Sequence, residues 1–164
     1  MAGVTNAFQQ GWTLVKLYLM IGLPGETDED AAAIVDLAEK ILQIGRQIIG
    51  NRAKVNVSVN TFVPKPHTPF QWSPLIDRET VARRQNLILD RVRRNKSIVV
   101  SFNDYDLTEL EVILSRATGL WVNSSIMPGK TGPFLDAWFD QFQPDIWYRS
   151  IEALKINTDR YLKP

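Results

Sequence analysis

Two turns in the sequence carry residues of the kinds that bind ligands in proteins. The first is GLPGETDED, residues 22–30, which follows the apolar run LVKLYLMI; the second is FVPKPHTPFQW, residues 62–72. Glycines such as Gly22 and Gly25 allow backbone to approach a ligand closely. A helix that begins after such a turn also offers backbone N–H groups that lack intrahelical partners. Both turns are therefore candidate binding sites.

Several side chains within these turns could act on a ligand. Glu26 could hydrogen-bond a ligand, or it could support the helix that follows. His67 is the one histidine of the chain, and imidazole has an unperturbed pKa near neutrality. It could face a substrate, or it could simply be an exposed loop residue. Thr68 and Phe70 lie beside His67 and share its two interpretations.

The composition excludes several kinds of site. The 164 residues include no cysteine and one histidine, which excludes thiolate metal sites, disulfides, cysteine nucleophiles and clusters of histidine ligands. A net charge of +1 gives no general attraction to nucleic acid or membrane. No apolar run reaches the roughly 20 residues that span a bilayer, and the N-terminal residues lack the pattern of a signal peptide. We expect a cytoplasmic protein.

The elements that must position the two turns follow from hydrophobic periodicity. Alternation predicts strands over residues 14–22 and 54–63 and a short strand over 98–102. Thr27 is expected to be the N-cap of a helix that stops at Gly50-Asn51. Its apolar stripe would comprise Ile34, Leu37, Ile41, Ile44 and Ile48. A second helix, over 77–95, would have Val81, Leu87, Ile88 and Val92 as its apolar side. This order predicts an α/β fold with parallel strands.

Each of the two longer strands has an apolar face and a face with polar members. The polar members are Lys16, Tyr18, Asn56, Ser58 and Asn60. In a barrel these side chains would point inward and line the interior. In an open sheet they would form a solvated face, and alternation alone does not decide between the two. Lys16 could bind an anionic group, or it could be an exposed strand residue.

The composition and the predicted secondary structure change after residue 104. We divide the chain into residues 1–104 and a mostly helical, aromatic-rich extension over residues 105–164, which starts with a helix over 107–116. Its aromatic residues are interpreted as its core, with a partner or ligand surface as the alternative: Trp121, Phe134, Trp138, Phe139, Phe142, Trp147 and Tyr148. The segment PGKTG, residues 128–132, lacks the upstream glycine of a phosphate-binding loop.

The second predicted helix is rich in cations. Residues 78–96 include Arg78, Arg83, Arg84, Arg91, Arg93, Arg94 and Lys96. A basic helix can follow a nucleic-acid backbone. However, Glu79 and Asp90 interrupt the cluster, and the whole chain is nearly neutral. A solvated outer helix is therefore favoured over an RNA-binding surface.

The two turns, taken together, resemble a known family. LYLMIGLPGETDED followed by VNVSVNTFVPKPHTPFQW is similar to the later part of a radical S-adenosylmethionine (radical SAM) enzyme. The resemblance is closest to an uncharacterised branch related to methylthiotransferases and cobalamin-binding radical SAM proteins, and it covers about residues 11–89. It implies a partial, TIM-like (β/α) barrel of which residues 14–22 and 54–63 are the fifth and sixth strands.

The resemblance also implies positions for cofactor contacts. The fifth-strand region of such enzymes supports the adenine of S-adenosylmethionine, and backbone at the end of the sixth strand contacts it too. The corresponding positions here are Met20, Ile21, Gly22, Pro24, Gly25, Glu26, Thr61, Phe62 and Val63. Substrate-facing candidates would be the polar strand residues Lys16, Tyr18, Asn56, Ser58 and Asn60, with His67 and Thr68.

The sequence departs from the family at one essential feature. The family holds a [4Fe–4S] cluster through a Cys-x-x-x-Cys-x-x-Cys motif, and this chain has no cysteine. We expect a C-terminal fragment that holds no cluster and performs no radical chemistry alone, whose partner is the missing N-terminal part of the barrel. Exposed strand edges would make the isolated chain self-associate. The alternatives are a non-enzymatic half-barrel that binds or oligomerises, and an RNA-binding module that uses the basic helix.

Overall fold

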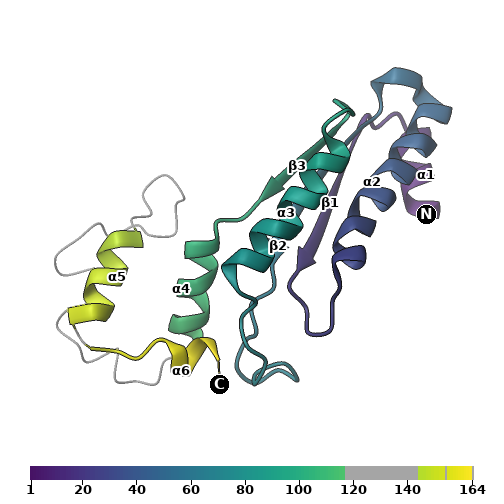
Figure 1. The fold of residues 1–164 in the computed structure, drawn as a ribbon. Coiled ribbons are helices and arrows are strands. Elements are labelled where there is room, and N and C mark those ends of the chain that lie inside the picture. Colours follow the sequence, from purple (N-terminus) through teal and green to yellow (C-terminus); the bar gives the residue numbers. More distant parts are fainter. Residues whose placement is uncertain (117–143, 154, 164) are drawn as a thin grey trace. The chain divides into compact units, whose positions relative to one another are not determined.

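The computed structural model describes residues 1–116, 144–153 and 155–163. They form two compact units, coloured along the chain in Figure 1. The first unit comprises residues 1–62 and 76–103, and the second comprises residues 63–75 and 104–164. The loop over residues 63–75, which the sequence division placed with residues 1–104, thus groups with the second unit.

The first unit alternates helices and strands. Its elements are α1 (Ala2–Gln9), β1 (Leu14–Ile21), α2 (Asp28–Ile49), the 3-10 helix η1 (Gly50–Arg52), β2 (Lys54–Thr61), α3 (Arg78–Val92) and β3 (Ile98–Phe102). The three strands form a parallel sheet in the order β1-β2-β3. The α/β class, the parallel order and the short third strand are therefore confirmed. Because β1 and β3 are both edges of this three-stranded sheet, barrel closure remains a prediction.

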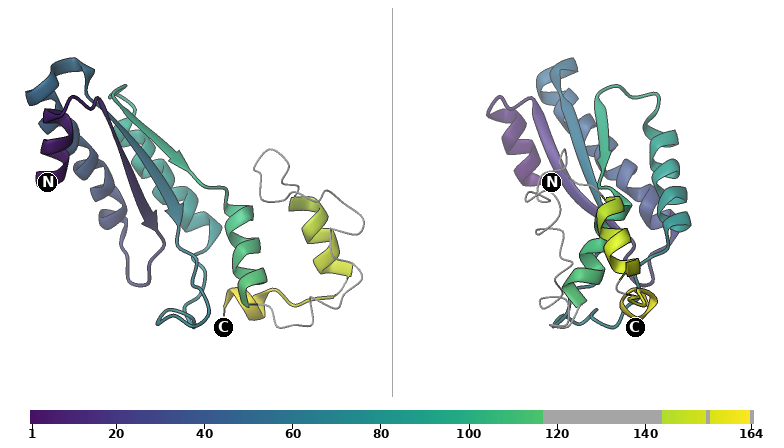
Figure 2. Two further views of the ribbon diagram at one scale, coloured as in Figure 1. Left: turned by 180° about the vertical axis from the view of Figure 1, so that it is seen from behind. Right: turned by 90° about the vertical axis from the view of Figure 1, so that its left-hand side faces the viewer.

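The sheet has one covered face and one open face. Figures 1 and 2 show α2 and α3 along the same face of the strands. Val55, Val57 and Val59 of the central strand point to that face and are at most 1% exposed. On the opposite face Tyr18 is 69% exposed. The predicted division of each strand into an apolar and a polar face is confirmed.

The buried residues of α2 and α3 differ in part from those that hydrophobic periodicity predicts. In α2, Ile34 and Ile41 are buried as expected, but Leu37 and Ile44 are half-buried and Ile48 is exposed. The buried face instead includes Ala31, Val35, Ala38, Leu42 and Gly45. In α3, Leu87 is exposed and Arg84 is buried among Val81, Ile88 and Val92.

A glycine in α2 permits close packing of its neighbours. A Cβ atom at Gly45 would lie 2.6 Å from Cζ of Phe8 and 2.8 Å from Cβ of Ala53. Phe8 and Ala53 are both fully buried. The absence of a side chain at Gly45 is therefore what allows α1 and Ala53, the residue before β2, to pack against α2.

The second unit contains helices α4 (Tyr105–Arg116), α5 (Pro144–Ala153) and α6 (Asp159–Leu162). Leu110, Ile113 and Ile151 form its buried cluster, against which Trp147 and Tyr148 pack. The core interpretation of these two aromatic residues is confirmed. The predictions for Trp121, Phe134, Trp138, Phe139, Phe142 and the PGKTG segment lie outside the described residues.

Gly45→Ala should destabilise the first unit by about 1–3 kcal/mol, because the added methyl group overpacks a site between two fully buried residues. Gly3→Ala is the matched control, since a Cβ atom there meets nothing within 4 Å. Urea unfolding of both variants measures the difference. Equal midpoints for the two variants would contradict the packing role of Gly45.

Side chains cap the two long helices of the first unit. Thr27 accepts a hydrogen bond from the N–H of Asp30 at 3.2 Å and donates its own N–H to that carboxylate at 2.9 Å, which confirms Thr27 as N-cap. Asp77 caps α3 by accepting bonds from the N–H and the hydroxyl of Thr80, each at 2.8 Å. Hydrogen bonds from the Thr80 backbone and then from its hydroxyl lower the pKa of Asp77.

Asp77→Ala should lower the free energy of unfolding by about 1 kcal/mol at pH 7 through loss of the cap. Because the pKa of Asp77 is lower in the folded state, its stabilisation is present above the ordinary carboxyl pKa of about 3.9 and is lost as pH falls through the folded value. The difference between wild type and Asp77→Ala should therefore shrink on acidification. Asp77→Asn, which keeps a capping oxygen that does not titrate, serves as the control in the same urea series.

Candidate functional site

The register of the sheet brings the first residues of the two turns together at the carboxyl ends of β1 and β2. Ile21, the last residue of β1, is paired with Thr61, the last residue of β2. The N–H of Phe62 then donates to the carbonyl of Ile21 at 2.8 Å. The carboxyl ends of β1 and β2, where α/β folds bind ligands, are thus side by side.

The turn after β1 depends on two glycines with positive φ. Gly22 has a φ of 94° and Gly25 a φ of 81°, and the N–H of Glu26 closes the turn on the carbonyl of Leu23 at 3.0 Å. A Cβ atom at Gly22 would lie 2.7 Å from Cγ2 of Ile76. At Gly25 nothing lies within 4 Å of such an atom. Gly22 therefore accommodates the neighbouring Ile76 side chain, whereas the turn is open at Gly25.

Glu26 holds this turn from within. Its Oε2 atom accepts the N–H of Gly22 at 2.6 Å and also a hydrogen bond from Nη1 of Arg84. The side chains of Glu26 and Arg84 are 9% and 7% exposed. The carboxylate is therefore a buried support of the turn, and its observed partners are protein groups.

Arg84 distributes its donors over the same turn. Nη2 donates to the carbonyl of Glu26 at 2.6 Å, and Nε donates to Oδ1 of Asp28 at 3.2 Å. Sequence reasoning missed this role because it counted Arg84 with the surface cations. Its position three residues after Val81 and four before Ile88, on the apolar stripe, was the available signal.

The end of β2 is joined to the end of β3 by a side chain. Oδ1 of Asn103 accepts the N–H of Thr61 at 2.8 Å, and the N–H of Asn103 donates to the carbonyl of Val59 at 3.4 Å. Asn103 thus continues the ladder beyond the last residue of β3. The hydroxyl of Thr61 is buried and has no hydrogen-bond partner within the described part of the chain.

The polar strand residues gather on the open face. Lys16 is beside Asn56, Tyr18 is beside Ser58, and Met20 is beside Asn60 in the register. Nζ of Lys16 lies 6.0 Å from the centre of the Tyr18 ring. These candidates therefore share one surface, which has hydroxyl, amide and ammonium groups.

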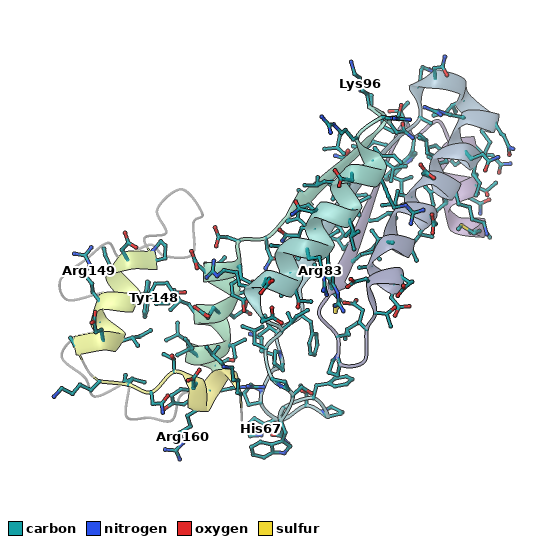
Figure 3. The ribbon with its side chains drawn as sticks, in the orientation of Figure 1. His67, Arg83, Lys96, Tyr148, Arg149 and Arg160 are labelled. Carbon is teal, nitrogen blue, oxygen red and sulfur yellow. The ribbon has the colours of Figure 1, made fainter. Side chains whose placement is uncertain are left out.

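His67 and Thr68 belong to the second unit. His67 lies at the tip of its loop (Figure 3), with a φ of 62° that non-glycine residues rarely adopt. Its N–H donates to Oε1 of Gln71 at 3.2 Å, and the Thr68 hydroxyl donates to the carbonyl of Lys65 at 2.8 Å. Both side chains therefore sit in a loop with internal hydrogen bonds.

Arg116 of α4 fixes this loop. Its Nη2 atom donates to the carbonyls of Gln71 at 2.9 Å and Ser73 at 2.7 Å, and its Nε atom donates to the carbonyl of Pro64 at 3.2 Å. Burial lowers the pKa of the Arg116 guanidinium. This contact could not be predicted from the sequence, because a single arginine at the end of a helix has no distinguishing pattern.

Two general features are clear for the residues that the structure describes. No three acidic or histidine side chains among them are grouped so that they could hold a metal ion. No helix in residues 1–116 or in the described C-terminal segments is long and apolar enough to cross a membrane.

Arg84→Ala should lower the free energy of unfolding by about 3–5 kcal/mol, because it leaves the Glu26 carboxylate buried without its charge partner. The control is Arg83→Ala. The Arg83 side chain is 56% exposed and contacts Asp28 at 3.1 Å, so its loss should cost less than about 1 kcal/mol. Chemical unfolding of the two variants gives both values, and similar losses would show that the buried pair contributes no more than the exposed one.

The comparisons with known proteins give two relatives. An uncharacterised protein of Methanocaldococcus jannaschii is 30% identical over 102 residues, which are 62% of this chain and 21% of that protein. The tRNA-2-methylthio-N(6)-dimethylallyladenosine synthase of Ehrlichia ruminantium is 25% identical over 139 residues, 84% of this chain and 27% of the synthase. No family model matches, and no solved structure matches significantly. The matched part of the chain spans 21% of the Methanocaldococcus protein and 27% of the synthase, and the similarity to the synthase points toward the radical SAM superfamily.

Proposed function

We propose that this chain is part of a radical SAM enzyme and forms one side of the pocket for the adenosyl group of S-adenosylmethionine. One observation carries the proposal: the Gly22–Gly25 turn and the end of β2 lie side by side at the carboxyl edge of a parallel sheet. Ligands bind at this edge in α/β folds. The similarity to a methylthio-group synthase over 84% of the chain supports the same assignment.

The pocket wall would be built mainly from backbone and apolar groups. The N–H groups of Gly22, Thr61 and Phe62 already donate to protein acceptors. The edge would therefore offer carbonyl oxygens and apolar surface, which suit the amino group and flat ring of adenine. Gly25, with open space around its Cα, would allow close approach, and the unpartnered Thr61 hydroxyl is a group that a bound ligand or water could satisfy.

The residues of this chain do not fit the iron–sulfur cluster of the family. The chain has no cysteine, and no described group of acidic or histidine side chains could replace the thiolates. The cluster, and the radical chemistry that it supplies in the family, would have to be provided by protein outside this sequence. What this chain would contribute is binding and orientation.

The open face would contribute the substrate side of the pocket. Lys16, Tyr18, Asn56, Ser58 and Asn60 share this face, and in a closed barrel it would be the interior. An ammonium group with hydroxyl and amide neighbours suits a polar or anionic substrate. The same open face would serve the competing hypothesis of a non-enzymatic binding module, so the test must separate the two.

RNA binding through the basic helix is less favoured by the contacts. Arg83 and Arg84 pair with Asp28, Arg84 also pairs with Glu26, and Arg91 pairs with Asp36. These arginines are therefore already neutralised within the first unit. We do not propose nucleic-acid binding by this helix.

The first test is the intact mass of the native protein, isolated from its source with an antibody raised against this chain. We expect a much larger species whose sequence includes Cys-x-x-x-Cys-x-x-Cys before residue 1. That species, reconstituted anaerobically, should release 5′-deoxyadenosine from S-adenosylmethionine. Disrupting the wall with Gly25→Val, where φ is 81°, should lower that rate at least about tenfold. A native mass equal to that of this chain would overturn the proposal and leave the binding module.

A further inference from the structure

A groove lies beside β3 on the first unit, away from the turns described above. Its volume is about 570 Å³, and it is formed by the last turn of α3, the connection to β3 and the strand itself. Its lining includes four apolar side chains and two cations: Leu89, Val92, Ile98, Val99, Arg93 and Lys96. Val99 is 56% exposed and Leu89 43% exposed. Apolar surface thus lies open next to positive charge.

The backbone of β3 is available along this groove. Val55 donates its N–H to the carbonyl of Ser97, and Asn103 donates to the carbonyl of Val59. In a parallel ladder this pattern directs the backbone N–H and carbonyl groups of Val99 and Ser101 toward β2. The backbone N–H and carbonyl of Val100 therefore point away from β2. No described strand pairs with β3 on that side. An exposed strand edge of this kind is a template for another extended chain.

The charges divide along α3. Arg83, Arg84 and Arg91 all form ion pairs with carboxylates. Arg93, Arg94 and Lys96, at and beyond the end of the helix, have no carboxylate partner among the described residues. Lys96 projects away from the ribbon in Figure 3. Of the charged side chains, Arg93, Lys96 and one acid, Asp90, line the groove, so the groove has a net positive charge.

We propose that the outer edge of β3 and this groove bind an extended acidic peptide segment by strand addition. The backbone of Val100 supplies hydrogen bonds to the added strand. Val99, on the open face of the sheet, contacts the apolar side chains on one face of that strand, and Arg93 and Lys96, at the end of α3, pair with the carboxylates on its other face. An RNA ligand would leave the apolar lining and the strand edge unused. A second copy of this chain would bring the same cations against each other, so the acidic peptide is the occupant that the charges favour.

The probe is a fluorescein-labelled, N-acetylated hexapeptide of alternating glutamate and valine, titrated with the purified chain and followed by anisotropy. We expect saturable binding that weakens as NaCl rises from ~50 mM to ~500 mM. The same peptide with glutamine in place of glutamate should bind about tenfold more weakly. Amide shifts in a ¹⁵N spectrum should centre on residues 93–102.

Three variants test the separate contributions. Val100→Pro removes the outward N–H without removing a β2–β3 bond, and it should lower affinity at least about tenfold. Arg93→Glu with Lys96→Glu should lower it by a similar factor, whereas Lys40→Glu on the exposed side of α2 should leave it unchanged. If Val100→Pro fails to fold, Val99→Glu, which places a like charge in the groove, replaces it.

Several results would overturn the proposal. They are absence of peptide binding, equal affinity of wild type and Val100→Pro, and a loss with Lys40→Glu as large as that with the groove variants. Competition by a single-stranded oligouridine at equal concentration would assign the cations to RNA instead. A concentration-dependent mass in sedimentation, removed by Val100→Pro, would assign the edge to a second copy.

Discussion

The carboxylate of Glu26 and the guanidinium of Arg84 lie where water is almost excluded, and the turn after β1 depends on their contact. Removing a charge from water is unfavourable unless another charge and further hydrogen bonds satisfy it. Here the carboxylate receives Arg84 and the N–H of Gly22, while Arg84 also binds the carbonyl of Glu26 and the side chain of Asp28. The partners are 58 residues apart in the sequence. Helix α3, which connects β2 to β3, thus positions the turn at the carboxyl end of β1.

The strands and their order could be predicted because their causes are local. Valines at positions 55, 57 and 59 alternate with polar residues, and this period of two is the pattern of a β-strand with one buried face. Helical segments between strands then require parallel pairing. The end of β2 was less clear, because the predicted strand extended to Val63 whereas the ladder stops at Thr61. Pro64, which has no N–H, limits the strand but does not identify its last residue.

The buried faces of the helices are harder to predict, because the periodicity of large apolar residues does not show where small residues are buried. In α2 the buried face carries Ala31, Ala38 and Gly45, and small residues there let neighbouring elements approach closely. Leu37 and Ile44 lie on the flanks and are only half-buried. Alternation likewise reports which face of a strand is apolar, and it carries no information about what covers the other face. The choice between a barrel lining and a solvated face therefore could not be made from the strands.

Each of the two candidate turns is held by an arginine from its own unit, and the physical reason differs between the two. At the first turn Arg84 neutralises a buried carboxylate. The second turn lies in a segment with four prolines, which supply carbonyls but no N–H donors. Arg116 provides the missing donors to Pro64, Gln71 and Ser73, and the planar five-donor guanidinium is well suited to several carbonyls at once. In both turns the arginine therefore acts on the backbone, and it fixes the loop through carbonyl oxygens that would otherwise lack donors.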